Sequence, residues 1–285
     1  SVGSTVAAVI RTMFAEKPNA ARAELDRVAR AVFLVCHDAH LLRVLLSGKP
    51  GAVQIAEAVA AKYPSWQRRL WRGKMTVVRN GIDLSRFHPG DRVAARTRLG
   101  LAPEAVVLGI VGTICERKGH DRLLAAFAAA RAECPGLTLV VVGTPEAESM
   151  DFAARLRAGA DADVHWLGRR DDISEILPAL DFLVSPSRHE GMGRVNVEAM
   201  ACALPVIGAD GTGIAEVVRA GETGLMVDAG DPAALTAAIL KLARDPDLRR
   251  RMGQAGLQRA RHLFEVERQT GQVLTDLRNL ARGRP

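Results

Sequence analysis

The segment that decides the fold runs from residue 105 to 143 and reads AVVLGIVGTICERKGHDRLLAAFAAARAECPGLTLVVVG. It begins and ends with short apolar runs rich in β-branched residues, 105–112 and 137–143, and a helical pattern fills 121–133 between them. Continuous apolar character is typical of strands that are buried on both faces of a parallel sheet. We therefore predict a strand–helix–strand unit with a right-handed crossover.

The same alternation continues along the chain to about residue 227. Further strands are predicted over 163–168, 181–186, 204–209 and 224–227, and further helices over 148–159, 171–180 and 196–202. Alternation of this kind is typical of a doubly wound sheet with helices on its faces. The predicted fold class is α/β, with a complete Rossmann-like domain built on a six-stranded parallel sheet.

The residues before about position 85 carry a less complete version of the pattern. We predict helices over 19–30, 38–47 and 48–71, a strand over 31–36, and a strand over 74–83 that leads into an Asn80–Gly81 turn. Two strands are too few for an independent sheet domain. The first 84 residues are therefore expected to be an incomplete α/β portion of a larger unit.

Charge and composition limit the classes of partner. The net charge is +7, and the residues from Lys241 onward hold 11 Lys or Arg against five Asp or Glu. A solvated helix face is the favoured interpretation of this basic tail, and contact with anionic lipid or an acidic substrate is the alternative. The chain has one Tyr and no nucleic-acid motif, so no nucleic-acid partner is expected.

The cysteines favour neither a metal site nor a disulfide framework. Cys36, Cys115, Cys134 and Cys202 show no CxxC pairing and no partnered histidine spacing. No apolar run approaches the roughly 18 residues of a membrane span, and no signal peptide is visible. We expect a cytoplasmic location, with a peripheral position at the cytoplasmic membrane as the alternative.

The first candidate loop is GTICERKGH, residues 112–120, directly after a predicted strand. Ligands of open parallel sheets bind at the carboxyl ends of the strands, so such loops are informative. Gly112 and Gly119 allow tight turns, and Arg117 and Lys118 place positive charge at the start of the next helix. A phosphate site and a solvated basic turn are equally supported, because the spacing matches neither a P-loop nor GxGxxG.

The second candidate loop is RHEGMGRVNVEAM, residues 188–200, which follows the predicted strand 181–186. Gly191 and Gly193 leave backbone N–H groups accessible to a ligand at the start of the next helix. The loop also delivers Glu190, which could bind a polyhydroxyl group.

Glu198 lies in the first turns of the same helix. Its carboxylate could accept two hydrogen bonds from a ribose diol. The alternative is an ion pair with Arg194 one turn earlier on an exposed face. Apolar neighbours such as Val197 and Met200 favour a buried position instead.

Several ordered motifs resemble one family. EGMGRVNVEAMACALPVI (190–207) resembles the E-x7-E region of retaining glycosyltransferases of family 4, which have the GT-B fold. GTICERKGHDRLLAAF (112–127) resembles their G-R-L-x-x-x-K-G segment, and VVRNGIDLSRFHPG (77–90) resembles the hinge before their C-terminal domain. GETGLMVDAGDPAALTAAI (221–239) resembles the stretch that follows their donor site. The resemblance covers about residues 30–281.

The resemblance implies a domain organisation and an activity. Residues 1–84 would be a remnant of the acceptor-side N-terminal domain, 85–263 the domain that binds a nucleotide sugar, and 264–285 a helix packing back towards the N-terminal part. The implied reaction transfers a hexose from a nucleotide diphosphate sugar to a glycan or lipid-linked acceptor, in bacterial envelope or exopolysaccharide synthesis. The donor is a substrate, and neither a cofactor nor a metal is implied.

The family's residue roles carry over onto matching positions. Lys118 would contact the diphosphate, Glu198 the ribose hydroxyls, and Glu190, the catalytic candidate, the donor sugar near its reacting carbon. Arg169, after the strand 163–168, would contact the base. The remaining donor-binding candidates lie in the two loops: Gly112, Thr113, Arg117, Gly191, Met192, Gly193, Arg194 and Val195.

Two departures from the family pattern leave alternatives open. The family's phosphate arginine falls on Thr113, which carries no charge, and Arg117 is the candidate replacement. The region that would hold the family's N-terminal catalytic histidine is shortened, and ordinary helix-start polarity is favoured for His37 and His40. A truncated nucleotide-sugar-binding module without transfer activity, or a sugar-nucleotide epimerase on the same fold, are the alternative functions.

Overall fold

The structure is a computed structural model that describes residues 53–54, 75–76, 81–228, 230–271 and 275. The chain divides into two compact units, Ser1–Ile82 with Leu263–Pro285, and Asp83–His262. The predicted strand 31–36, the predicted helices 19–30 and 38–47, and both His37 and His40 lie outside the described residues.

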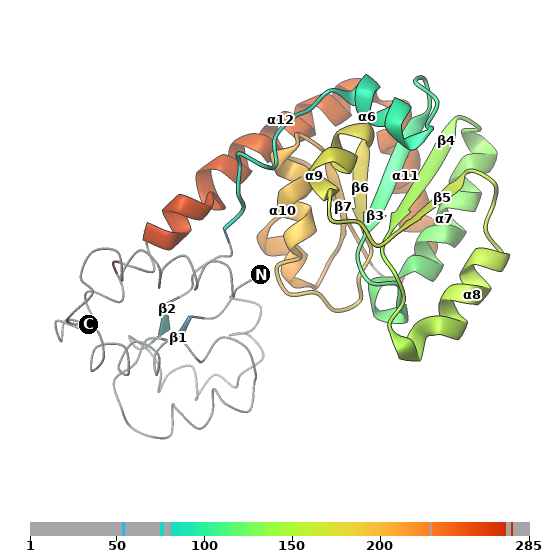
Figure 1. Ribbon diagram of the computed structural model, residues 1–285, viewed down its shortest axis with the longest axis horizontal. Helices are drawn as coiled ribbons and strands as arrows, with labels where there is room; N and C mark the ends of the chain where they lie inside the picture. Colours follow the sequence, from blue (N-terminus) through green and yellow to red (C-terminus); the bar gives the residue numbers. More distant parts are fainter. Residues whose placement is uncertain (1–52, 55–74, 77–80, 229, 272–274, 276–285) are drawn as a thin grey trace. The chain divides into compact units, whose positions relative to one another are not determined.

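The unit Asp83–His262 is built on a six-stranded parallel sheet (Figure 1). Its strands are β3 (Val106–Val111), β4 (Leu137–Val142), β5 (Val164–Gly168), β6 (Phe182–Ser185), β7 (Val206–Ala209) and β8 (Gly224–Val227). Each coincides with a predicted strand, and all neighbouring pairs are parallel. The predicted α/β fold with a six-stranded parallel sheet is confirmed.

Helices and short 3-10 turns connect the strands. The helices are α6 (Arg92–Leu99), α7 (His120–Glu133), α8 (Met150–Ala158), α9 (Ile173–Ile176), α10 (Arg194–Ala201), α11 (Pro232–Arg244) and α12 (Pro246–Leu263). The 3-10 turns are η1 (Glu116–Lys118), η2 (Ala147–Ser149), η3 (Leu177–Ala179) and η4 (Gly213–Glu216). Local signals set several ends: Asp91 accepts hydrogen bonds from the N–H groups of Val93 and Ala94 at the start of α6, and Gly100 ends that helix with φ 66°.

The strand order, β5-β4-β3-β6-β7-β8, determines where a ligand can bind. The chain moves outward from β3 through β4 to β5, then returns to the other side of β3 with β6. The carboxyl ends of β3 and β6 therefore flank the point at which the strand order reverses. In open α/β sheets the ligand crevice lies there.

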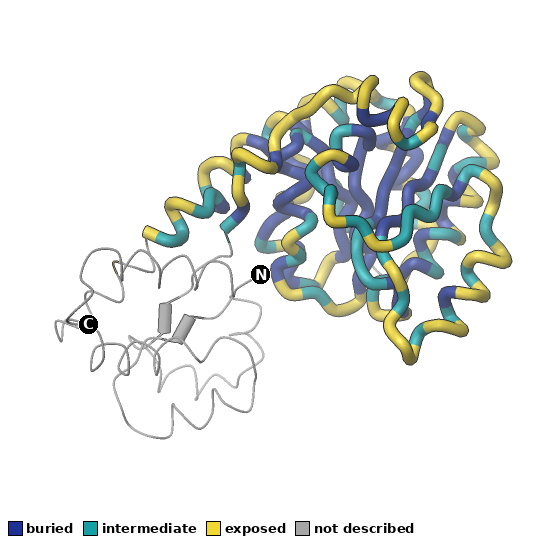
Figure 2. The backbone as a smooth tube through the Cα atoms, viewed as in Figure 1, coloured by how far each residue is buried: buried dark blue, intermediate teal, exposed yellow. Residues whose placement is uncertain are grey.

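The core of this unit lies between the sheet and the helices α7 and α11. Leu108, Val141 and Val184 from three strands pack in one buried cluster with Phe127 of α7 and Ile239 of α11. Figure 2 shows the strands as buried throughout most of their length, with exposure confined to loops and outer helix faces. Burial on both faces explains why the strands are almost entirely apolar.

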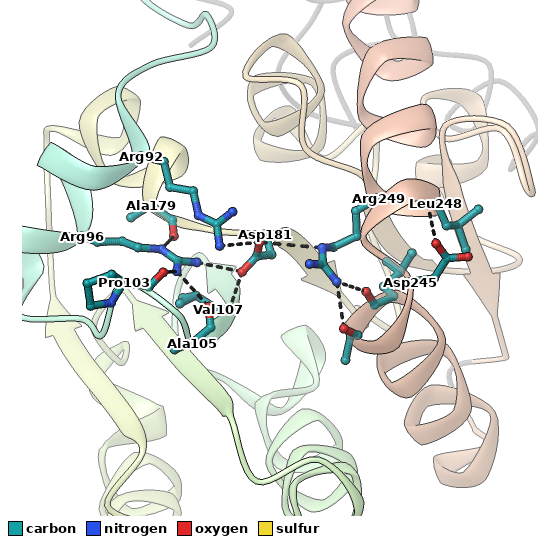
Figure 3. A network of polar contacts seen from close by, with 12 residues as sticks. Arg92, Arg96, Pro103, Ala105, Val107, Ala179, Asp181, Asp245, Leu248 and Arg249 are labelled. Atoms are coloured by element: carbon teal, nitrogen blue, oxygen red, sulfur yellow. Dashed lines mark hydrogen bonds and ion pairs between the residues drawn. The ribbon is translucent and has the colours of Figure 1, made fainter.

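A buried polar network fastens the amino ends of β3 and β6 (Figure 3). Asp181 Oδ2 accepts hydrogen bonds from the Val107 N–H at 2.7 Å and from Arg96 at 2.8 Å. Arg92 and Arg249 reach the other carboxylate oxygen at 3.1 and 3.7 Å. Burial lowers the pKa of Arg96, and the Asp181 charge opposes that shift. The network ties α6 and α12 to the sheet at the edge opposite the ligand crevice.

The basic stretch after Lys241 is only partly the solvated face that its composition favours. Arg249 donates to the carbonyl of Ala243 at 2.9 Å in addition to reaching Asp181. Arg259 donates to the carbonyls of Val217 and Glu216, both at 2.8 Å. These two arginines hold α12 against the rest of the unit, whereas other arginines of α12 are exposed.

In the other unit, the described strands are β1 (Val53–Gln54) and β2 (Met75–Thr76), which pair in parallel. The helix predicted over 48–71 is therefore wrong at Val53–Gln54, because a short apolar run does not distinguish a helix from a buried strand. Residues 266–271 are helical, and the Ile82 N–H donates to the Phe264 carbonyl at 2.6 Å. The assignment of 1–84, 85–263 and 264–285 to particular roles stays a prediction.

Candidate functional site

The two predicted loops meet at the carboxyl ends of β3 and β6. Lys118, at the end of η1, forms an ion pair with the carboxylate of Glu190 in the loop after β6. The two side chains are only 20% and 15% exposed. The two loops were predicted as separate candidates, and the structure brings Lys118 of the first into contact with Glu190 of the second.

The position of Lys118 follows from the glycines around it. Gly119 follows η1 and has a φ of +75°, which favours glycine, and α7 begins at the next residue. A Cβ added at Gly119 would lie 2.5 Å from the Pro186 carbonyl oxygen. The loop after β6 therefore lies directly against the backbone of Gly119, and Glu190 in that loop lies within reach of Lys118. On the other side, Gly112 lies against the Lys118 side chain.

Backbone contacts fasten the two loops to each other. The Arg188 N–H donates to the Arg117 carbonyl at 2.9 Å, and the Arg117 guanidinium donates to the His189 carbonyl at 3.3 Å. Arg122 donates to the Pro186 carbonyl at 2.6 Å. Arg117 thus helps to hold the loop in place, and its predicted contact with phosphate stays a prediction.

The start of α10 presents backbone to the crevice. Gly193 precedes the helix with φ +63°, and no side chain caps it. The N–H groups of a helix's first turn have no acceptor within the helix, so they suit an anion. The loop before it is fixed by the Gly213 N–H, which donates to the Glu190 carbonyl at 3.0 Å. Met192 is buried, whereas Gly191 is exposed.

Glu198 combines the two interpretations made from sequence. It forms the ion pair with Arg194, at 3.1 Å, but its side chain is 10% exposed against 45% for the arginine. The predicted ion pair with Arg194 is present, but Glu198 does not lie on an exposed face of the helix. Burial raises the pKa of Glu198, and the Arg194 charge opposes that shift. The carboxylate is thus a buried acceptor in the second turn of α10, directly beside the crevice.

Two buried polar residues in this region were missed by the sequence analysis. His120, the first residue of α7, is 1% exposed, and burial lowers its pKa to about 4. Asn196 in α10 is 0% exposed, and neither of its amide atoms has a hydrogen-bond partner among the described residues. A polar residue inside the apolar run VNVEAM is the signal that could have singled out Asn196.

The loop after β5 holds the predicted base contact. Arg169 is 81% exposed, and its nearest acidic partner, Asp171, lies 4.0 Å away. The next residue, Arg170, makes two hydrogen bonds to Asp172, at 2.8 and 2.5 Å. Arg169 is therefore available to a ligand. Thr113 lies at the end of β3 and is half-buried.

Among the described residues, no group of three or more His, Cys, Asp or Glu side chains could hold a metal ion. Cys115, Cys134 and Cys202 are free thiols. No helix in the described part of the chain is both long and apolar enough to cross a membrane.

Comparison with known proteins adds a family to this geometry. The family model described as "Glycosyl transferases group 1" matches residues 91–259, more than half of the chain. A D-inositol 3-phosphate glycosyltransferase of Segniliparus rotundus is 36% identical over 216 residues, covering 74% of this chain and 48% of that protein. A lipopolysaccharide core biosynthesis mannosyltransferase, LpcC, of Rhizobium leguminosarum bv. viciae is 33% identical over 203 residues, covering 70% of this chain and 58% of that protein.

A solved structure agrees at the level of the fold. The structure of Anabaena Alr3699/HepE in complex with UDP and glucose matches with a TM-score of 0.70 and 22% identity, covering 90% of this chain and 80% of that chain. The chain spans about half the length of the first of the curated relatives it matches, at 48%.

Proposed function

Since this chain belongs to the group 1 glycosyl transferases and has a fold of the GT-B type, we propose that its unit Asp83–His262 binds the nucleoside diphosphate of a nucleotide sugar. The whole protein would transfer a hexose, with retention of anomeric configuration, to a glycan or lipid-linked acceptor. The observation that carries the proposal is the contact between Lys118 and Glu190 at the reversal of strand order, beside the start of α10.

The diphosphate would lie between Lys118 and the first turn of α10. A lysine ammonium and helix N–H groups together are a suitable site for phosphate oxygens. Thr113 would donate one hydrogen bond and Arg117 would add charge from the loop. These groups also stabilise the negative charge that develops on the leaving diphosphate, so the proposal includes no metal and no cofactor.

The ribose and the base would lie further along the carboxyl ends of the strands. Glu198 is a buried carboxylate in the second turn of α10, so its oxygens could accept hydrogen bonds from the two ribose hydroxyls without competition from bulk water. Burial raises the pKa of Glu198, and the charge of its Arg194 partner opposes that shift. Arg169, exposed after β5, would contact the base.

The sugar would lie over the glycine turn, beside Glu190. A side chain at Gly191 would meet nothing within 4 Å, so a hexose ring could approach there, and Met192 and Val195 would contribute backbone to the donor. In the proposed front-face reaction, the acceptor hydroxyl oxygen bonds to the anomeric carbon on the side from which the diphosphate departs. The bond from that carbon to the diphosphate oxygen breaks, and the hydroxyl proton passes to the departing diphosphate.

A cytoplasmic location with a peripheral contact at the inner face of the membrane belongs to the same proposal, because a lipid-linked acceptor would lie there. A binding module without transfer is the second candidate function. The observation that favours it is that the described site residues all concern the donor.

Saturation-transfer NMR on the full chain tests donor binding directly. UDP-glucose and GDP-mannose are the probes, and the account expects saturation of ribose and sugar protons for one of them. The signals should weaken in Lys118→Met and persist in Lys241→Met, an exposed lysine of α11. Absence of saturation for both nucleotide sugars would count against the proposed donors. Retention is tested separately, by comparing the anomeric proton coupling of any product with that of the donor.

A further inference from the structure

Asn196 is the buried polar group in α10 that the proposed function does not use. It is 0% exposed, and neither Nδ2 nor Oδ1 has a hydrogen-bond partner among the described residues. Leaving a buried amide without partners costs roughly 1–3 kcal/mol, so such a group needs an explanation in the ligand-free protein. Its neighbours Val197 and Met200 are fully buried and apolar, and an apolar side chain would suit the same position.

The amide lies next to the glycine turn and to Glu190. A Cβ added at Gly193 would be 2.4 Å from Asn196 Nδ2 and 3.2 Å from Glu190 Cγ. The side chains of Asn196 and Glu190 therefore both lie in the space that a side chain at Gly193 would fill. An N–H donor without an acceptor thus lies close to a carboxylate whose present partner comes from a different loop.

That present partner is Lys118, which the proposed function assigns to the diphosphate. If a phosphate draws the lysine away, Glu190 is left in a position that is 15% exposed without its present cationic partner. An uncompensated carboxylate in such a place is unfavourable. The carboxylate then requires another donor, and the Asn196 amide is the buried donor next to it that remains unused.

We infer that Asn196 is a positioning residue for Glu190: when a nucleotide sugar occupies the site, the Asn196 Nδ2–H takes the place of Lys118 as the donor to the Glu190 carboxylate. The inference rests on the proposed function. It explains why an amide is kept without partners in the free protein, since its acceptor becomes available only in the donor complex. Asn196 itself need not touch the donor.

The test is calorimetric titration of the full chain with UDP, UDP-glucose, GDP and GDP-mannose. Asn196→Leu has a similar volume and removes the amide. We expect Asn196→Leu to bind the nucleotide sugar about ten-fold more weakly, the scale of one hydrogen bond to a charged group. Binding of the matching nucleoside diphosphate should weaken to a similar extent, because its phosphates also draw Lys118 away from Glu190.

Two further measurements separate positioning from a structural role. The thermal midpoint of Asn196→Leu should equal or exceed that of the wild type, because an unpartnered buried amide has been removed. In a Glu190→Ala background, the effect of Asn196→Leu on nucleotide-sugar binding should disappear, because the acceptor of the proposed hydrogen bond has been removed. Asn196→Ala is the second variant if the leucine prevents folding.

A loss of nucleotide-sugar binding that persists in the Glu190→Ala background would overturn the inference. So would unchanged nucleotide-sugar binding by both Asn196 variants. If the wild type binds the nucleotide sugar normally in these cases, the proposed function stands and only the role of Asn196 fails. If the wild type binds none of the four probes, the proposed function and the inference fail together.

Discussion

Lys118 and Glu190, 72 residues apart in the chain, form an ion pair across the carboxyl ends of β3 and β6. The pair joins the cation proposed to bind phosphate to the acid proposed to bind sugar. In the free protein the two groups therefore neutralise each other, and donor binding as proposed would have to separate them. On the proposed function, the ion pair competes with the ligand for Lys118.

This competition predicts that Glu190→Gln binds a nucleoside diphosphate more tightly than the wild type does. Removing the carboxylate charge frees Lys118, and we expect a gain of about three- to ten-fold, as for a partly buried ion pair worth about 1 kcal/mol. Calorimetry with UDP and GDP measures the change. Glu133→Gln removes a carboxylate that pairs with Arg244 at the far end of α7 and should leave binding unchanged. Weaker binding by Glu190→Gln would refute the competition.

The phosphate assignment of Lys118 predicts a dependence on the ligand. Lys118→Met should weaken UDP or GDP binding by about ten-fold, because a charge-assisted contact to phosphate is lost, and should have little effect on the corresponding nucleoside. Lys241→Met is the matched control on an exposed helix face. Equal losses for nucleotide and nucleoside would show that Lys118 does not act through phosphate.

Burial of His120 predicts a stability change at mildly acid pH. The pKa of His120 is about 4 in the folded protein and has its ordinary value of about 6.5 when unfolded. Between these values the unfolded chain binds more protons, so the free energy of unfolding should fall as the pH falls from about 6.5 to 4, by up to about 3 kcal/mol.

Urea denaturation at several pH values measures this effect. His120→Gln should have a smaller pH dependence than the wild type, whereas His88→Gln, at an exposed position, should retain it. An unchanged slope in His120→Gln would show that His120 does not contribute to the acid sensitivity.

The Asp181 network predicts a large loss of stability without loss of binding. Asp181→Asn leaves Arg96 buried, at 1% exposure, without its counter-charge, which should lower the free energy of unfolding by about 3 kcal/mol. Asp247→Asn removes a surface pair with Arg250 and should cost less than about 1 kcal/mol. Below its unfolding transition, Asp181→Asn should bind nucleotide normally. A loss no larger than that of Asp247→Asn would contradict the structural role of the network.

The sheet could be predicted because its information is local. Each strand is a short apolar run, and the alternation of strands with helical segments implies a parallel, doubly wound sheet. Side-chain contacts between residues far apart in the sequence depend on the tertiary structure, so these contacts were less predictable. The contact between Lys118 and Glu190 depends on which loops the topology brings together, and the burial of Asn196 depends on the packing of α10 against β6 and β7.

Short segments were also ambiguous. Val53–Gln54 was predicted as helix, because its apolar neighbours fit an amphipathic pattern equally well, and it pairs as a strand. Glu198 shows a related limit: sequence spacing indicated both the Arg194 pair and the buried environment, and it could not indicate that the two coexist. The ion pair depends on Arg194 within the same helix, whereas the burial of Glu198 depends on the elements packed around that helix.

The proposed site binds a nucleoside diphosphate at the carboxyl ends of β3 and β6, where Glu198 accepts hydrogen bonds from the ribose hydroxyls. The most direct test is calorimetric titration of UDP, GDP and ADP into the wild-type chain, Glu198→Gln and the control Glu133→Gln. The account predicts saturable binding of one nucleotide, weakened about ten-fold or more in Glu198→Gln alone, with an unchanged thermal midpoint for the free protein. No binding of any nucleotide by the wild type, or equal binding by Glu198→Gln, would contradict it.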